Sequence, residues 1–156
     1  MAETSAGLLM YRQRDGAIEV FLVHPGGPFW ARKDLGAWSI PKGLADPDED
    51  PLEAARREFR EETAMDATGP FAYLGSLRQP SGKIVHAWAF QGDCDPAGIR
   101  SNTFRMEWPP RSGRTREFPE VDRAGWFDLE EAGRRILKGQ AAFLDRLKEA
   151  LKGGGP

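Results

Sequence analysis

The feature that most constrains this chain is a helix whose start is marked by Asp50 and Pro51. Asp50 is a good N-cap, because its carboxylate can accept a hydrogen bond from a free N–H of the first turn. Pro51 then falls at the first helical position, where its missing N–H costs nothing. Glu53 follows three residues after Asp50, as in a capping box. Good helix formers occupy residues 52–58, so a helix is predicted from residue 51 through the acidic run that follows.

This predicted helix has an apolar stripe and an acidic arc beside it. The stripe, which should face a core, consists of Leu52, Ala55 and Phe59. Glu58, Glu61 and Glu62 are spaced i, i+3 and i+4, so their side chains are neighbours and repel one another when ionised. A hard cation such as Mg²⁺, which also keeps water and phosphate oxygens in its shell, would compensate. The arc therefore predicts one wall of a Mg²⁺–phosphate site, and the alternative is a solvated acidic surface.

The loop before the helix favours the metal site. Gly43, Glu49, Arg57-Glu58 and Phe59-x-Glu61-Glu62 have the spacing of the Nudix box, and the segment Gly43 to Met65 resembles that motif at every fixed position except one. The exception is Ala64, where the Nudix family has glycine. Glycine suits the left-handed position that ends a helix, and alanine adopts it at a cost of about 1 kcal/mol. No carboxylate is lost by this departure.

The resemblance to the Nudix hydrolase family implies a fold and a chemistry. The fold would be of the α/β class, an α/β/α sandwich with a mixed β-sheet between helices. The activity would be hydrolysis of a nucleoside diphosphate linked to another group, by attack of a water that is activated by Mg²⁺, with Mn²⁺ as the alternative cation. Metal ligands would come from the carbonyl of Gly43 and from Glu61 and Glu62. Glu58 would be a third ligand or the general base.

Further site residues are expected outside the helix. In many Nudix proteins a downstream acidic residue binds metal or acts as the base. The candidates are Glu117 as a metal ligand and Glu120 as a catalytic residue, and Glu107 is a weaker candidate. Arg57 is expected to hold Glu49 or a helix carboxylate in an ion pair. Cations that could bind substrate phosphates are Lys42, Arg32, Arg114 and Arg116. For the arginines after residue 109 the alternative is a solvated loop.

The substrate class stays open at this point. A nucleotide or polyphosphate is expected, and a nucleoside triphosphate fits about as well as a dinucleoside polyphosphate or an inositol polyphosphate. The alternative function is a catalytically weak nucleotide-binding or sensing module on a Nudix fold. Such modules typically lack box carboxylates, whereas Glu58, Glu61 and Glu62 are all present.

Length and composition narrow the class of protein. The 156 residues fit one domain, expected over 1–151, followed by a loose tail over 152–156. A net charge of −2 argues against a dedicated nucleic-acid binder. No apolar run is long enough for a transmembrane helix, and the single cysteine, Cys94, fits a reducing cytoplasm. The oligomeric state is left open, and a homodimer is compatible with the sequence.

The rest of the chain predicts strands and a last helix. Apolar runs at 8–11 and 18–24 flank Asp15-Gly16 and predict a hairpin. Further strands are expected at 38–43, 71–78, 83–91, 101–108 and around 126–127, with 83–91 in a central position because both of its faces are apolar. Residues 109–119 are expected to be irregular. A helix is expected from 128 to 151, interrupted near Gly139. His24 ends its strand and is expected to have a local partner, with a substrate phosphate as the alternative.

Overall fold

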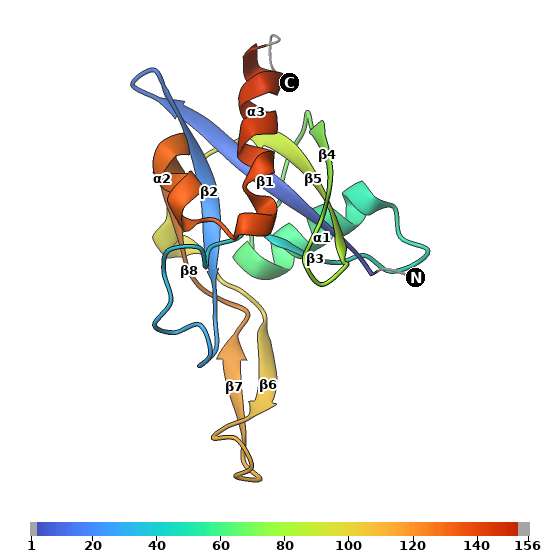
Figure 1. Cartoon of the computed structure of the whole chain (residues 1–156), viewed down its shortest axis with the longest axis vertical. Helices are drawn as coiled ribbons and strands as arrows, with labels where there is room; N and C mark the ends of the chain where they lie inside the picture. Colours follow the sequence, from blue (N-terminus) through green and yellow to red (C-terminus); the bar gives the residue numbers. More distant parts are fainter. Residues whose placement is uncertain (1–2, 153–156) are drawn as a thin grey trace.

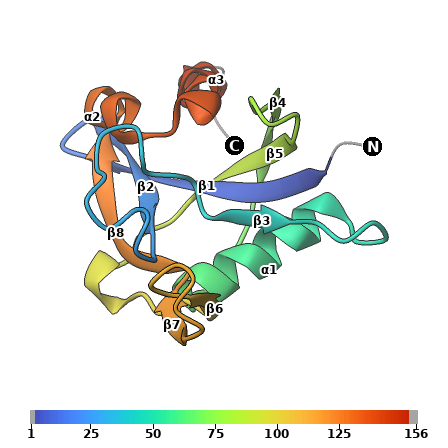
Figure 2. The ribbon, with the colours of Figure 1, turned by 60° about the horizontal axis from the view of Figure 1, so that its bottom comes forward.

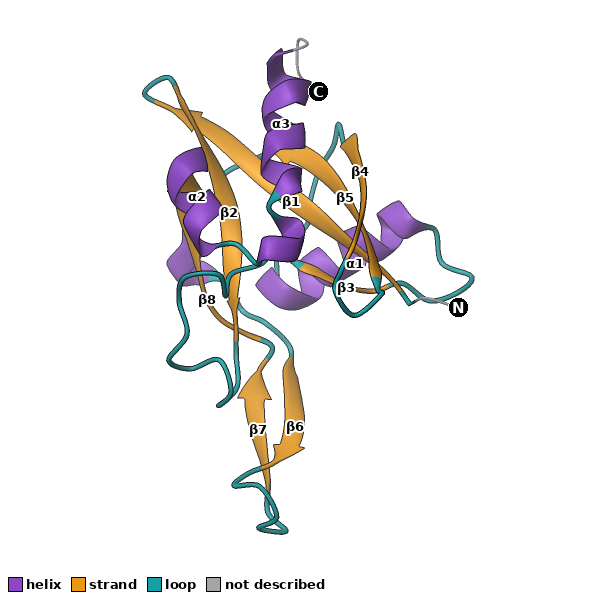
Figure 3. Cartoon of the chain, viewed as in Figure 1, coloured by secondary structure: helices purple, strands orange, loops and turns teal. Residues whose placement is uncertain are grey.

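A mixed β-sheet forms the centre of the molecule (Figures 1 and 3) in a computed structural model that describes residues 3–152. Its strands are β1 (Thr4–Arg14), β2 (Ala17–Pro25), β3 (Lys42–Leu44), β4 (Ala72–Arg78), β5 (Ile84–Gln91) and β8 (Val121–Asp128). Their spatial order is β4-β5-β1-β2-β8, and β3 pairs with β1. β1 runs parallel to β5 and antiparallel to β2 and β3. The predicted hairpin of β1 and β2 and the central place of β5 are confirmed.

Helices cover both faces of this sheet (Figure 2). α1 (Pro51–Thr63) lies on one face, and α2 (Leu129–Arg135) and α3 (Ala142–Lys152) lie on the other. Alternate residues of β1 enter the two cores: Leu8 and Met10 pack in the α1 layer, whereas Leu9 and Tyr11 pack in the layer of α2 and α3. This alternation follows from the two-residue period of a strand. The α/β/α sandwich is confirmed.

A separate two-stranded sheet projects from the body of the molecule (Figure 1). It pairs β6 (Thr103–Glu107) with β7 (Thr115–Pro119), and we call residues 103–119 the arm. The prediction of an irregular 109–119 is therefore wrong for residues 115–119, and the strand near 101–108 does not join the main sheet. The carboxylate of Glu107 explains the turn, because it accepts hydrogen bonds from the N–H groups of Arg111 and Gly113 at 3.0 and 3.1 Å.

Two connections differ in detail from the sequence prediction. The expected strand over 38–43 is shorter, because only Lys42–Leu44 forms a strand while Trp38 and Ser39 make isolated bridges. Pro41, between them, has no N–H to donate. The last helix is interrupted as predicted: α2 ends at Arg135, a 3₁₀ turn covers Lys138–Gln140, and α3 follows. Another 3₁₀ turn covers Pro96–Gly98.

The ends of the chain add little. Of the tail that was expected over 152–156, Lys152 belongs to α3 and residues 153–156 lie outside the described residues. Between residues 3 and 152, no helix combines the length and the apolar composition that crossing a membrane would require.

Candidate active site

α1 begins and ends where the sequence predicts. The Asp50 carboxylate accepts a hydrogen bond from the N–H of Glu53 at 3.2 Å, and Pro51 is the first helical residue. At the other end Ala64 adopts the left-handed conformation, with a φ of 65°, and its N–H donates to the carbonyl of Arg60 at 2.8 Å. Ala64 thus keeps the backbone geometry that a glycine would favour at this position.

Glu62 is the most buried carboxylate of the helix, with 8% of its surface exposed. Its pKa is raised to about 9, chiefly by burial; the negative charges of Glu58 and Glu120 contribute to the increase, and the positive charge of Lys42 opposes it. When this carboxyl group is ionised, the surrounding protein compensates its charge only in part. A cation beside Glu62 would supply that compensation.

Glu58 and Glu61 lie next to each other on the same helix and differ in exposure. The exposed fraction is 12% for the Glu58 side chain and 32% for that of Glu61. The pKa of Glu58 is raised to about 7, first by burial and then by the neighbouring Glu61, while the guanidinium of Arg57 opposes both effects. The predicted repulsion within the acidic arc is therefore present.

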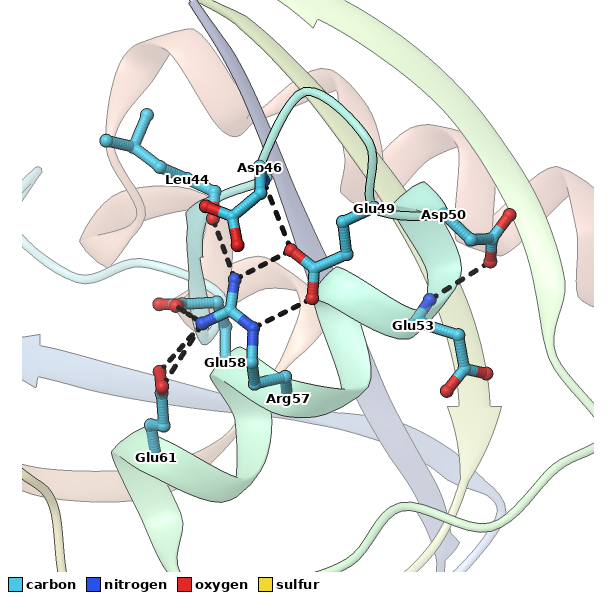
Figure 4. A network of polar contacts seen from close by, with 8 residues as sticks. All are labelled: Leu44, Asp46, Glu49, Asp50, Glu53, Arg57, Glu58 and Glu61. Carbon is cyan, nitrogen blue, oxygen red and sulfur yellow. Dashed lines mark hydrogen bonds and ion pairs between the residues drawn. The ribbon is translucent and has the colours of Figure 1, made fainter.

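Arg57 links this arc to the preceding loop (Figure 4). Its Nε and Nη2 donate to the two carboxylate oxygens of Glu49 at 2.8 and 3.0 Å, and Nη2 also donates to the carbonyl of Leu44 at 3.0 Å. Its Nη1 donates to Glu58 at 2.7 Å and to Glu61 at 3.0 and 3.1 Å. The hydrogen bonds from Arg57 lower the pKa of Glu49 to about 2. The expected ion pair of Arg57 is confirmed.

Gly43 is required by the close approach of β3 to α1. A Cβ atom at this position would lie 1.6 Å from Oε1 of Glu58, so no side chain fits. β3 is held in place by its pairing with β1, in which Gly43 lies opposite Ala6. The backbone of Gly43 therefore lies directly beside the Glu58 carboxylate of the acidic arc.

A chain of backbone hydrogen bonds connects Glu120 to α1. The N–H of Asn102 donates to the carbonyl of Glu61 at 2.7 Å, and the N–H of Glu120 donates to the carbonyl of Asn102 at 2.8 Å. Burial and the charge of Glu61 raise the pKa of Glu120. Asn102 was missed in the sequence, because its role depends on backbone contacts to residues far along the chain.

The other two downstream acids lie elsewhere. Glu117 is on the arm with 57% of its side chain exposed, 3.9 Å from Arg105, and Glu107 holds the turn of the arm. Among the three candidates, the structure therefore brings only Glu120 to the carboxylates of α1.

A cleft of about 250 Å³ lies between α1, β2 and β8. Its polar side is formed by Lys42, Glu62 and Glu120, together with Ser39. Its apolar side includes Trp30, Val23, Pro25, Val121 and Leu137. Burial lowers the pKa of Lys42, while the charges of Glu62 and Glu58 oppose this. The cleft thus combines one buried and one half-buried carboxylate with a half-buried cation and an aromatic side chain.

The predicted phosphate-binding cations are spread over three places. Lys42 lines the cleft. Arg32 is exposed on the loop between β2 and β3 and is not part of the cleft lining. Arg114 and Arg116 are exposed on the arm, where the Arg116 guanidinium lies 5.5 Å from the ring centre of Phe118.

The donor set of the site fits a hard divalent cation. All candidate ligands are oxygens: the carboxylates of Glu58, Glu61 and Glu62 and the carbonyl of Gly43. Within residues 3–152, no three acidic, histidine or cysteine side chains already stand in a metal-binding arrangement. Glu58 and Glu61 instead bind Arg57. Holding a cation would require those carboxylates to turn from Arg57 toward Glu62.

Comparison with known proteins agrees with the motif and the fold. The family model of the NUDIX domain matches residues 1–147. This chain belongs to the Nudix family, as the spacing of the box and the α/β/α sandwich indicate.

Individual proteins that resemble this chain share 16–34% of its residues over the aligned regions. An RNA pyrophosphohydrolase of Bartonella henselae is 34% identical over 108 residues, which cover 60% of this chain and 57% of that protein. The chain thus spans little more than half the length of this relative. An Ap4A hydrolase of C. elegans in a binary complex has a TM-score of 0.68 at 24% identity, covering 96% of this chain and 98% of that one. The NUDIX domain of Shewanella oneidensis NrtR, solved with ADP ribose, has a TM-score of 0.67 at 16% identity, covering 97% and 89%. These two likenesses show the shared fold.

Proposed function

We propose that this protein is a divalent-cation-dependent pyrophosphohydrolase, which cleaves a phosphoanhydride bond in a compound that contains a nucleoside diphosphate. The observation that carries the proposal is Glu62, a buried carboxylate with a strongly raised pKa that lines a cleft with Lys42 and Glu120. A structural carboxylate gains nothing from such a position. A carboxylate that holds a cation, which in turn binds a phosphate, does.

The cation would be held by Glu58, Glu61 and Glu62 and by the carbonyl of Gly43. When bound, Mg²⁺ or Mn²⁺ would neutralise phosphate charge and lower the pKa of a coordinated water. We assign the general base to Glu120, because it lines the cleft together with Glu62 and its backbone is tied to α1 through Asn102. Glu58 is the alternative base. The geometry gives no support to Glu117 as a ligand.

Phosphate binding would begin at Lys42, the cation that lines the cleft. Arg32, Arg114 and Arg116 are farther out, so they would contact only those parts of a substrate that extend beyond the cleft. This division suits a long substrate. A dinucleoside polyphosphate and a nucleoside triphosphate are the two classes that we consider, and the proteins named above include an Ap4A hydrolase and an RNA pyrophosphohydrolase.

A substrate screen with Mg²⁺ tests the proposal. The panel holds nucleoside triphosphates, oxidised triphosphates, diadenosine polyphosphates, nucleotide sugars and NADH, with phosphate and pyrophosphate measured separately. We expect hydrolysis of at least one compound, and the loss of that hydrolysis when EDTA replaces Mg²⁺. Tight nucleotide binding by calorimetry without any Mg²⁺-dependent product would instead favour a sensing module on a Nudix fold.

A further inference from the structure

His24 lies at the end of β2 and is completely buried, with 0% of its surface exposed. Its Nδ1 is 2.8 Å from Oδ1 of Asp122, and its Nε2 is 2.6 Å from the carbonyl oxygen of Lys33. A carboxylate and a carbonyl can only accept hydrogen bonds, and a neutral imidazole has one donor. Both bonds therefore require a proton on each ring nitrogen, and Asp122 balances the resulting charge.

The two partners of His24 belong to two different segments that each contribute a residue to the cleft. Asp122 is two residues beyond Glu120, near the start of β8. Lys33 belongs to the loop between β2 and β3, which carries Trp30 into the cleft, and the Lys33 ammonium lies 5.0 Å from the centre of the Trp30 ring. One buried ring thus joins the segment of the proposed base to the segment of the aromatic wall.

The His24 ring is itself held in one orientation by Trp38. The two rings meet edge to face, with their centres 5.2 Å apart. The indole N–H of Trp38 donates to Asp34, the residue after Lys33, at 2.8 Å. On the other side, the N–H of Gly26 donates to the carbonyl of Glu120 at 2.9 Å. The loop is therefore attached both at its beginning and near Lys33.

We propose that His24 is a positioning residue, which as a doubly protonated imidazolium fixes the Trp30 loop relative to Glu120 across the cleft. It does not touch the substrate. It acts through Lys33 and Asp122, each of which places a residue of the cleft. The functional part of this inference rests on the function proposed above, whereas the two hydrogen bonds of the ring do not.

Substitutions separate positioning from folding. His24→Phe fills the space without donors, so the loop loses its anchor, and we expect kcat/KM to fall roughly tenfold to a hundredfold with effects on both KM and kcat. Asp122→Ala should act similarly. Asp122→Asn should rescue most of the activity, because its amide can donate to Nδ1 of a neutral ring whose Nε2–H still binds Lys33. A folded His24→Phe with unchanged kcat/KM, or an Asp122→Asn as poor as Asp122→Ala, overturns the proposal.

NMR of the ¹⁵N-labelled His24 imidazole tests the two hydrogen bonds of the ring without any measurement of turnover. The wild type should show two slowly exchanging ring N–H groups for His24, and Asp122→Asn should show one. A single ring N–H in the wild type contradicts the double donor. If the wild type hydrolyses nothing in the screen, the function proposed above fails, and these signals still decide whether His24 joins the two segments.

Discussion

The guanidinium of Arg57 binds both carboxylate oxygens of Glu49, through Nε–Oε2 and Nη2–Oε1 contacts of 2.8 and 3.0 Å. The same group reaches Glu58 and Glu61 through Nη1. One side chain therefore sets the position of the loop before α1 and of two candidate ligands. We expect this ion pair to position the loop and the two carboxylates rather than to stabilise the fold, because partly exposed ion pairs add little to the free energy of unfolding.

Arg57→Lys tests whether Arg57 positions the site without contributing much to stability. A lysine has a single ammonium and cannot reproduce a two-bond contact with Glu49 together with the contacts to Glu58 and Glu61. We expect the hydrolysis rate to fall roughly tenfold to a hundredfold through misplaced ligands. The free energy of unfolding in urea should change by less than about 1 kcal/mol. Arg56→Lys is the matched control, because Arg56 on the same helix pairs only with the exposed Glu53 among the described residues. If both variants stay folded and both lose the same share of the hydrolysis rate, Arg57 has no special role in placing the ligands.

Ala64→Gly should stabilise the protein. Ala64 is in the left-handed region with a φ of 65°, where a Cβ atom is unfavourable. After the larger backbone entropy of glycine in the unfolded chain is subtracted, the free energy of unfolding should rise by up to roughly 0.5 kcal/mol. Ala150→Gly, inside α3, should lower it by roughly 0.5 to 1 kcal/mol. Chemical denaturation measures the free energy of unfolding of both variants. An equal decrease in Ala64→Gly and Ala150→Gly would contradict backbone strain at Ala64.

The cation-free protein should lose stability as pH rises. The pKa of Glu62 is about 9 in the folded state and near its ordinary 4.5 in the unfolded chain. Between these values the folded state binds more protons than the unfolded state, so the free energy of unfolding decreases with increasing pH. Glu62→Gln removes this titration and should flatten the decrease. Urea denaturation from pH 5 to 9 in EDTA measures how the free energy of unfolding depends on pH in the wild type and in Glu62→Gln. The same pH dependence in both proteins would show that Glu62 is not the group responsible.

The arm should matter for long substrates. Arg116 lies opposite Met106 in the register of β6 and β7, whereas Arg105 lies opposite Glu117 on the other face. Replacing Arg114 and Arg116 with alanine should raise the KM of a dinucleoside tetraphosphate roughly tenfold, as expected for the loss of charge-assisted phosphate contacts, with little change in kcat. The KM of a nucleoside triphosphate should change less. Arg105→Ala is the control. An unchanged KM for both substrates would remove the arm from substrate binding, and equal increases would contradict its preference for the long substrate.

Local signals explain why α1 could be predicted from sequence. Its start depends on Asp50 and Pro51, which are adjacent, and its acidic arc depends on spacings of three and four residues. The box loop follows a fixed motif of the same length scale. These features need no knowledge of the rest of the chain, so the helix, its carboxylates and the contact between Arg57 and Glu49 agree with the structure.

Long-range contacts explain what the sequence left open. Glu120 is brought to α1 by Asn102, whose backbone binds that of Glu61, 41 positions before it in the chain. The turn of the arm is held by the Glu107 carboxylate, which accepts hydrogen bonds from the N–H groups of Arg111 and Gly113. No local periodicity encodes either contact. The choice of Glu120 over Glu117 and the strand at 115–119 therefore required the fold.

The most direct test of the central claim is Mg²⁺-dependent turnover by Glu62→Gln, measured beside the wild type and Glu53→Gln on the best substrate of the screen. Glu53 is an exposed glutamate on the same helix, so Glu53→Gln removes one negative charge without touching the cleft. We expect Glu62→Gln to remain folded and to lose turnover by about two orders of magnitude or more, as for removal of a group that stabilises charge in the transition state, while Glu53→Gln matches the wild type. Undiminished turnover in a folded Glu62→Gln would contradict the assignment of this carboxylate to a catalytic cation site.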